Sequence, residues 1–117
     1  MEAVIYKICS AEAWAKAEQS GVFEGEAIDA EDGYIHFSTA TQAGETARLH
    51  FRDREGLVLL TVAAAPLGDD LKWEPSRGGD LFPHLFADLP LDAVLWEKPL
   101  PLGADGAHVF PVEMKEA

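Results

Sequence analysis

Residues 32–42, with the sequence DGYIHFSTATQ, join a short strand directly to the start of a helix. Apolar and polar side chains alternate over residues 34–38, as in a strand that is buried on one face. Ile35 and Phe37 would then point to one face of a sheet. The opposite face would carry the polar groups of Tyr34, His36 and Ser38. This stretch therefore predicts a strand that gathers polar side chains in one place.

The helix that follows carries its own start signal. Thr39 and Gln42 have the spacing of a capping box, in which each side chain bonds a backbone N–H group of the other residue. The first turn of a helix leaves other N–H groups without intrahelical partners, and these favour an anionic or carbonyl-bearing ligand. An imidazole, a phenol and two hydroxyls are expected to converge there, which predicts a small-molecule site.

The composition indicates one domain over residues 1–117. Nearly half of the residues (48%) are apolar, so a core can form without disulfide or metal staples. Cys9 is the sole cysteine, which excludes an intramolecular disulfide and disfavours a structural zinc–thiolate site. No apolar run approaches the ~20 residues that span a bilayer, and the N-terminus lacks a signal-peptide pattern. We therefore expect a cytoplasmic protein.

The charge balance narrows the class of partner. Nine basic and 21 acidic residues give a formal net charge of −12. Such a charge repels phosphate backbones and anionic membrane surfaces, because both are bound mainly through lysine and arginine. The sequence thus predicts no nucleic-acid partner and no membrane partner. We expect a monomer or weak oligomer with a small-molecule ligand.

The rest of the chain predicts short elements separated by turn residues. Helices are expected at Ser10–Ser20 and from Thr39 to about Phe51, and residues 22–31 have no period and predict a loop. Strands are expected at residues 4–8, 57–62, 71–74, 81–86 and 91–96, followed by a hairpin turn at 103–106. The apolar run at 57–62 predicts a central strand, whereas Pro83 should keep its strand out of a central position. Two early helices and several late strands predict an α+β fold with a mainly antiparallel sheet.

Four short segments occur in an order and spacing that match a known family. They are Tyr6-Lys7-Ile8, the segment DGYIHFST at residues 32–39, Trp73-Glu74, and Phe82-Pro83-His84-Leu85. With these segments the chain resembles the small bacterial proteins catalogued as domain of unknown function 952. The resemblance covers nearly the whole chain, and the IHFST and FPHL pieces are specific as a pair.

The resemblance implies a fold. That family is grouped with ADP-ribosyltransferase-like folds, which are split, mostly antiparallel β cores with early helices that bind NAD between two sheets. Two features of this chain depart from that pattern. The first strand of those folds commonly carries His or Arg for the adenosine ribose, where this chain has Lys7. Their catalytic glutamate has two candidate counterparts, Glu74 and Glu97.

Seven side chains are candidates for the site. We predict His36 and Glu74 as catalytic residues, and Lys7, Tyr34, Ser38, Thr39 and His84 as substrate-binding residues. His36 could donate to a ribose hydroxyl or act as acid or base, or it could be a structural imidazole bonded to a neighbouring strand. Glu74 could stabilise a positive oxocarbenium-like transition state, or it could be an ordinary surface glutamate.

The remaining candidates also have two interpretations each. Ser38 and Thr39 could hold a phosphate or hydroxyl group, while Thr39 could serve only as the helix cap. Lys7 could meet a ligand anion or be an exposed basic residue, and His84 could face the same cleft as His36 or brace its turn. Tyr34 could stack on a ligand ring. His50 and His108 are expected to be structural or exposed.

Three functions stay open from the sequence. The first is a protein that binds NAD as substrate and transfers ADP-ribose, and the second is a non-catalytic module that keeps the cleft for another small molecule. The third is a metal-assisted hydrolase that uses His36 and His84. Its metal signal is weak, since the chain has no helical His pair and no Cys-x-x-Cys motif. The first depends on His36 and Glu74 facing a common cleft.

Overall fold

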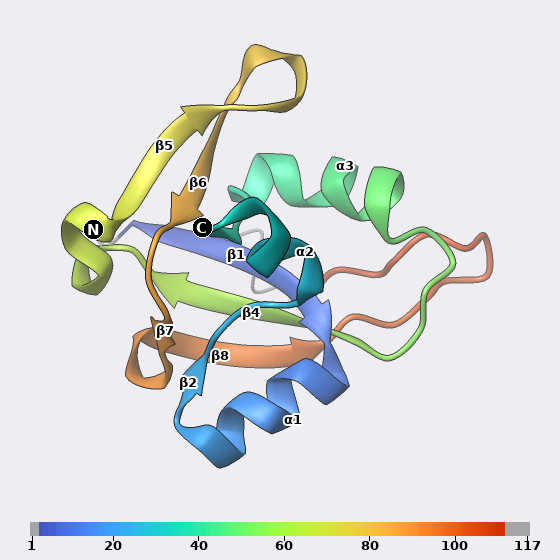
Figure 1. Cartoon of the computed structure of the whole chain (residues 1–117). Coiled ribbons are helices and arrows are strands. Elements are labelled where there is room, and N and C mark those ends of the chain that lie inside the picture. The colour runs from blue at the N-terminus through green and yellow to red at the C-terminus, as the bar shows by residue number, and fades with distance from the viewer. Residues whose placement is uncertain (1–2, 112–117) are drawn as a thin grey trace.

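The computed structural model describes residues 3–111 and builds them around two antiparallel β-sheets (Figure 1). One sheet has the strand order β1 (Val4–Ser10), β4 (Leu57–Ala63), β8 (Val94–Pro99). The other has the order β3 (Ile35–His36), β6 (Leu81–Leu85), β5 (Leu71–Pro75), and β2 (Val22–Phe23) pairs separately with β7 (Leu89–Pro90). Every pairing is antiparallel. The α+β class with mostly antiparallel sheets is therefore confirmed.

The first sheet is sandwiched between two helices. All seven residues of β4 are buried, as its continuous apolar run predicts for a central strand. The helix α1 (Ala11–Ser20) packs Trp14 and Ala17 against one face of this sheet. The helix α3 (Ala40–His50) packs Ala43 and Ala47 against the opposite face. Figure 1 shows the two helices on either side of the sheet.

Both of these helices begin as the sequence predicts. The Ser10 hydroxyl accepts a hydrogen bond from the Ala13 N–H at 3.0 Å, and α1 stops at Gly21, whose φ is 94°. At α3 the capping box is complete: the Thr39 N–H donates to the Gln42 side chain at 3.0 Å, and the Gln42 N–H donates to the Thr39 hydroxyl at 3.2 Å.

The loop expected at residues 22–31 is wrong. This segment contains β2 and a short helix, α2 (Ala27–Asp32), so three helices precede β4 in the described part of the chain, and not two. Six residues are fewer than two helical turns, so no 3.6-residue period could show in the sequence. The caps hold the helix instead, because the Glu26 N–H donates to the Asp29 carboxylate at 2.7 Å and Gly33 takes a φ of 88°.

The expected exclusion of Pro83 from a central strand is also wrong. Pro83 lies in β6, between β3 and β5. Its carbonyl accepts from the Phe37 N–H at 3.0 Å, and in an antiparallel pair the nitrogen of the same residue faces the same neighbour. Regular pairing of β3 ends at His36, so the missing N–H falls at the end of the ladder.

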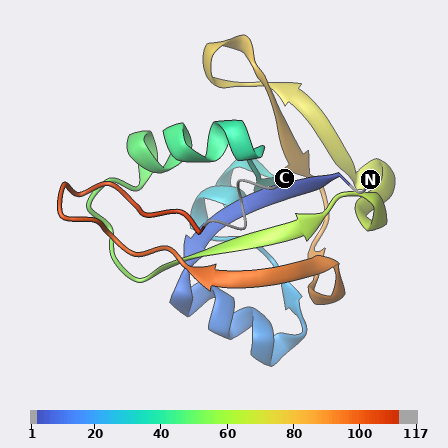
Figure 2. The same cartoon turned by 180° about the vertical axis from the view of Figure 1, so that it is seen from behind.

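Within residues 3–111, one backbone bridge joins the two three-stranded sheets. Tyr6 and Ser38 exchange two N–H···O hydrogen bonds of 2.8 Å each, which joins β1 to the chain that follows β3. The β5–β6 hairpin extends away from the body of the molecule beyond this bridge (Figure 1). At the opposite end, residues 52–54 and 105–108 lie side by side (Figure 2), with the Asp53 N–H 3.3 Å from the Gly106 carbonyl.

Short 3₁₀ turns complete the fold. They are η1 (Ala65–Asp70), η2 (Arg77–Gly79) and η3 (Leu91–Ala93), and η3 replaces the first half of the strand expected at residues 91–96. The hairpin turn expected at residues 103–106 is confirmed by the bridge between Leu102 and His108. None of the helices within residues 3–111 has the length and apolar character needed to cross a membrane.

Candidate functional site

A cavity of about 510 Å³ lies where β1, α3 and the β3–β6 pair separate beyond the Tyr6–Ser38 bridge. Its size is within the range of small-molecule sites. The polar groups that line it and that carry the argument are those of Lys7, Asp29, Asp32, His36, Ser38 and His84. Four of these six are candidates from the sequence, and the two aspartates come from α2.

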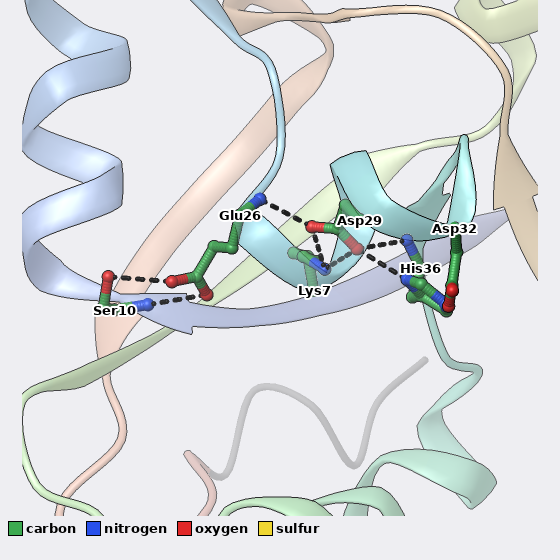
Figure 3. Close-up of polar contacts among 6 residues, drawn as sticks. All are labelled: Lys7, Ser10, Glu26, Asp29, Asp32 and His36. Atoms are coloured by element: carbon green, nitrogen blue, oxygen red, sulfur yellow. Dashed lines mark hydrogen bonds and ion pairs between the residues drawn. The ribbon is translucent and has the colours of Figure 1, made fainter.

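Asp29 is the centre of a polar network in this cavity (Figure 3). Its carboxylate is 1% exposed and accepts hydrogen bonds from the Lys7 ammonium, at 3.0 Å to each oxygen. It also accepts from the backbone N–H groups of Glu26, at 2.7 Å, and His36, at 3.0 Å. These donors satisfy a carboxylate that would otherwise be costly to bury.

The environment of Asp29 fixes its charge. Burial alone would raise the pKa of this carboxyl. The side-chain hydrogen bond from His36, the charge of Lys7 and the backbone N–H groups of Glu26 and His36 outweigh burial, and the pKa lies well below its usual range. Asp29 is therefore an anion throughout the neutral range.

Lys7 is part of this network and is not an exposed basic residue. It lies in β1 with 5% of its surface exposed. Both of its ammonium contacts go to Asp29, which is 22 positions away in the sequence. Lys7 lines the cavity, and its charge is balanced from within the protein. A ligand would meet a neutral buried pair at this point, and not a free cation.

His36 is held on both sides by carboxylates. Its Nδ1 is 2.6 Å from an Asp29 oxygen, and its Nε2 is 2.9 Å from an oxygen of Asp32. Ionised carboxylates accept hydrogen bonds and do not donate them, so both contacts are satisfied only when both ring nitrogens carry hydrogen. The side chain is one-third exposed (33%) and lines the cavity. His36 thus lines the cavity with both of its ring nitrogens already in contact with carboxylates of the protein.

His84 is held on one side only. It pairs with His36 across β3 and β6, and the two ring centres are 5.7 Å apart. Its Nδ1 is 2.8 Å from an oxygen of Glu74 on β5, and the ring of Tyr34 stacks on it with centres 4.1 Å apart. His84 lines the cavity, whereas among the described residues Glu74 does not. Glu74 therefore reaches the site through His84.

Tyr34 does not offer a free ring face on this side of the sheet. Besides stacking on His84, its ring lies 4.7 Å from that of His36 and 5.1 Å from that of Phe86. It lines a second, smaller cavity of about 230 Å³, together with Ile35 and Phe86. Burial raises the pKa of the Tyr34 phenol, and the nearby charges of Asp32 and Glu74 raise it further. Tyr34 therefore orients the two imidazoles.

Ser38 and Thr39 have different positions. Ser38 lines the cavity, is 6% exposed, and has its hydroxyl 3.2 Å from that of Thr46 on α3. Thr39 caps α3 and is not among the described residues that line the cavity. The cavity runs along the side of α3, which supplies Thr46 and His50, and not at its N-terminus. The capping box uses the Thr39 and Gln42 N–H groups, and the cavity lies beside α3 and away from Thr39.

The second candidate glutamate lies elsewhere. Glu97 is exposed on β8, where it pairs with Leu60 in the other sheet. Among the two candidates, only Glu74 contacts a residue of the cavity. His108 bonds the carbonyl of Arg54 at 2.8 Å at the far hairpin, in agreement with a structural role.

Comparisons with known proteins identify the family. Residues 8–97 match the family described as protein of unknown function (DUF952). The chain belongs to this family. No curated protein matches it.

Two solved structures of another protein are similar to this chain over most of its length. The X-ray structure of the protein CC0527 from Caulobacter crescentus has 49% sequence identity and a TM-score of 0.92, and it covers 97% of this chain and 99% of that one. The solution NMR structure of CC0527 has 53% identity and a TM-score of 0.81, with 89% and 90% covered. The match over residues 8–97 establishes the DUF952 family, and the two solved structures show that CC0527 has a similar fold.

The geometry of this DUF952 chain bears on the metal-assisted alternative. Within residues 3–111 there is no group of three or more His, Cys, Asp or Glu side chains placed to hold a metal ion. His36 has no free ring nitrogen, because both face carboxylates. A two-histidine metal site with His84 would require His36 to give up one of these contacts.

Sequence reasoning missed Asp29, the residue that holds the DUF952 site together. Two signals could have found it. Lys7 lies in an otherwise apolar strand, and a buried ammonium needs a carboxylate partner. The spacing Glu26-x-x-Asp29 with Gly33 beyond it is also typical of a short capped helix.

Proposed function

We propose that this DUF952 protein binds a small nucleotide-like molecule in the cavity between its two sheets, with NAD or ADP-ribose as the candidate ligands. The observation that carries the proposal is a cavity of about 510 Å³ whose polar wall is pre-arranged around the buried Lys7–Asp29 pair. Pre-arranged donors and acceptors lower the cost of ordering on binding. The nucleotide class follows from the resemblance to ADP-ribosyltransferase-like folds, and the transfer of ADP-ribose is the reaction that this resemblance implies.

The charges around the cavity support a nucleotide-sized polar ligand. The protein carries a net charge of −12, yet the charged lining of the cavity combines the two acids Asp29 and Asp32 with the two bases Lys7 and Arg54. This part of the surface is consequently less repulsive to phosphate groups than the remainder of the molecule. The Ser38 hydroxyl and the His84 imidazole add hydrogen-bonding groups for ribose hydroxyls.

Thermal melting with NAD and with ADP-ribose tests this proposal. A ligand at about 100 times its Kd adds ~2.7 kcal/mol to the free energy of unfolding, which raises the Tm of a domain of this size by several degrees. Ser38→Ala should reduce the ligand-induced rise in Tm because Ser38 lines the cavity.

Thr39→Ala is the matched control. It removes a neighbouring hydroxyl that caps α3. It should lower the Tm of the free protein by an amount that corresponds to about 1 kcal/mol, and leave the ligand-induced rise unchanged. An unchanged Tm with both nucleotides would overturn the nucleotide assignment.

A further inference from the structure

We propose that His84 is the group in this cavity that exchanges a proton with the bound molecule, and that Glu74 is the positioning residue that fixes its tautomer. This inference rests on the proposed function, because it assigns the chemistry of the same cavity. It moves the acid–base role from His36, the expectation from the sequence, to its cross-strand neighbour.

His84 has one ring nitrogen in contact with Glu74 and one that is free to meet a ligand. Among the described residues, Nε2 of His84 has no hydrogen-bond partner. It is also not one of the two buried and unpartnered side-chain atoms of the described chain, which belong to Trp14 and Thr61. The side chain as a whole is only 4% exposed and lines the cavity. Nε2 therefore keeps accessible surface, and we infer that it faces the cavity that His84 lines.

The contact with Glu74 determines which nitrogen of the neutral His84 ring carries the hydrogen. Glu74 accepts at Nδ1, so Nδ1 carries the hydrogen, and the neutral imidazole keeps its lone pair on Nε2. A carboxylate behind a histidine also stabilises the imidazolium that forms when Nε2 takes a proton. The ring plane is fixed by the stack with Tyr34, whose interplanar angle to His84 is 24°. His84 thus has the orientation of a general base toward the ligand.

The neighbouring His36 differs from His84, because both of its ring nitrogens already contact carboxylates. Among the described residues, the titratable side chains with contacts to His84 are those of Glu74, His36 and Tyr34, and Lys72 on β5 is its cross-strand partner. Of the two histidines, His36 has both nitrogens committed to Asp29 and Asp32, so it has no nitrogen with which to take a proton from a ligand.

With NAD and water as reactants, His84 would act as the base in hydrolysis of the bond between nicotinamide and ribose. The water O–H proton moves to Nε2 of His84, and the water oxygen bonds to C1′ of the nicotinamide ribose. The bond from C1′ to the nicotinamide nitrogen breaks, and nicotinamide leaves as a neutral molecule with the electron pair. His84 then passes the proton to solvent.

The state of His84 can be measured without any ligand. In ¹⁵N-labelled protein, NMR correlation of the ring nitrogens with their carbon-bound hydrogens distinguishes the two neutral tautomers. In mildly alkaline buffer we expect a protonated Nδ1 and an unprotonated Nε2. Glu74→Gln should abolish this preference, since an amide can donate as well as accept, whereas Glu97→Gln on β8 should leave it unchanged. A protonated Nε2, or a tautomer that is indifferent to Glu74→Gln, would overturn the inference.

The role of the nitrogen is tested with NAD, by nicotinamide release and by the ligand-induced rise in Tm. His84→Asn keeps an N–H group close to the position of Nδ1 for Glu74 and removes Nε2. It should lower the rate of nicotinamide release roughly 10²–10⁴-fold and keep a melting transition. Release at the wild-type rate in His84→Asn, or an NAD-bound wild-type protein that releases no nicotinamide, counts against the role.

The two proposals can fail separately. If neither nucleotide raises the Tm of the wild-type protein, the nucleotide assignment fails, and the NMR measurement still decides the tautomer of His84.

Discussion

Asp29 shows how one residue can hold a site together while remaining inconspicuous in the sequence. It is one acid among 21, yet its carboxylate accepts from the Lys7 ammonium, from Nδ1 of His36 and from two backbone N–H groups. Each of those donors would be buried or half-buried without an acceptor if the carboxylate were lost. A buried ion pair adds little stability over an apolar pair, but removing one partner leaves a costly buried charge.

Asp29→Asn should therefore destabilise the protein by about 3 kcal/mol or more, because the Lys7 ammonium stays buried without an anion. Denaturant unfolding measures the change. Asp32→Asn is the control, since Asp32 is 40% exposed and its contact with His36 is partly in solvent. That substitution should change the free energy of unfolding by less than about 1 kcal/mol. Equal effects of the two substitutions would contradict the central role of Asp29.

The same carboxylate should make stability depend on pH in the acidic range. The pKa of Asp29 is lowered in the folded state, so at low pH the unfolded chain binds a proton that the folded protein does not. Its contribution to stability is thus complete above the ordinary pKa of aspartate, about 4, and is lost progressively as the pH falls below it. Asp29→Asn should unfold with a shallower acid dependence than the wild-type protein.

At the scale of elements, long periodic segments could be predicted and short capped ones could not. The helices α1 and α3 and the central strand β4 follow from periodicity, caps and an apolar run. The helix α2 has six residues and one buried residue, Asp29, so its sequence contains no apolar stripe. Pro83 fits in a central strand because the neighbouring strand β3 ends close to it. The sequence around Pro83 does not show where β3 ends.

The turn before α2 supplies an element-scale prediction. Gly25 has a φ of 94°, and an added Cβ would lie 2.8 Å from the Cβ of Asp29. Gly21 has the same φ of 94° with no atom within 4 Å of such a Cβ. Gly21→Ala should cost about 1 kcal/mol of stability from backbone strain alone. Gly25→Ala should cost at least about 1 kcal/mol more, because α2 must move to relieve the overlap.

Unfolding midpoints in denaturant compare the two glycine variants directly, since their strain terms match. The ligand-induced rise in Tm should also fall in Gly25→Ala, where Asp29 is displaced, and not in Gly21→Ala. Equal stability of the two variants would show that the first turn of α2 yields without disturbing Asp29.

At the scale of the whole molecule, the site exists because segments far apart in the sequence meet around the cavity between the two sheets. The Lys7–Asp29 pair, the Tyr6–Ser38 bridge and the His36–His84 contact each join elements that no local pattern connects. The sequence supplied the residue types, and the resemblance supplied the expectation of a cleft between sheets. Neither the sequence nor the resemblance predicted which polar groups would form hydrogen bonds with one another. They therefore could not predict which groups would remain free for a ligand.

The same architecture predicts two levels of local stability. The strand β4 is buried along its whole length and is paired on both sides. The strand β5 is an edge strand with largely exposed residues and one partner, β6. Native-state hydrogen exchange should therefore show β4 amides exchanging only through global unfolding, and the paired β5 amides exchanging faster through local opening of the hairpin. Low concentrations of denaturant separate the two routes, because only exchange by global unfolding accelerates steeply with denaturant. Equal exchange rates and equal denaturant dependence in both strands would mean that the two sheets open together, and that the bridge between Tyr6 and Ser38 couples them more strongly than a two-bond contact should.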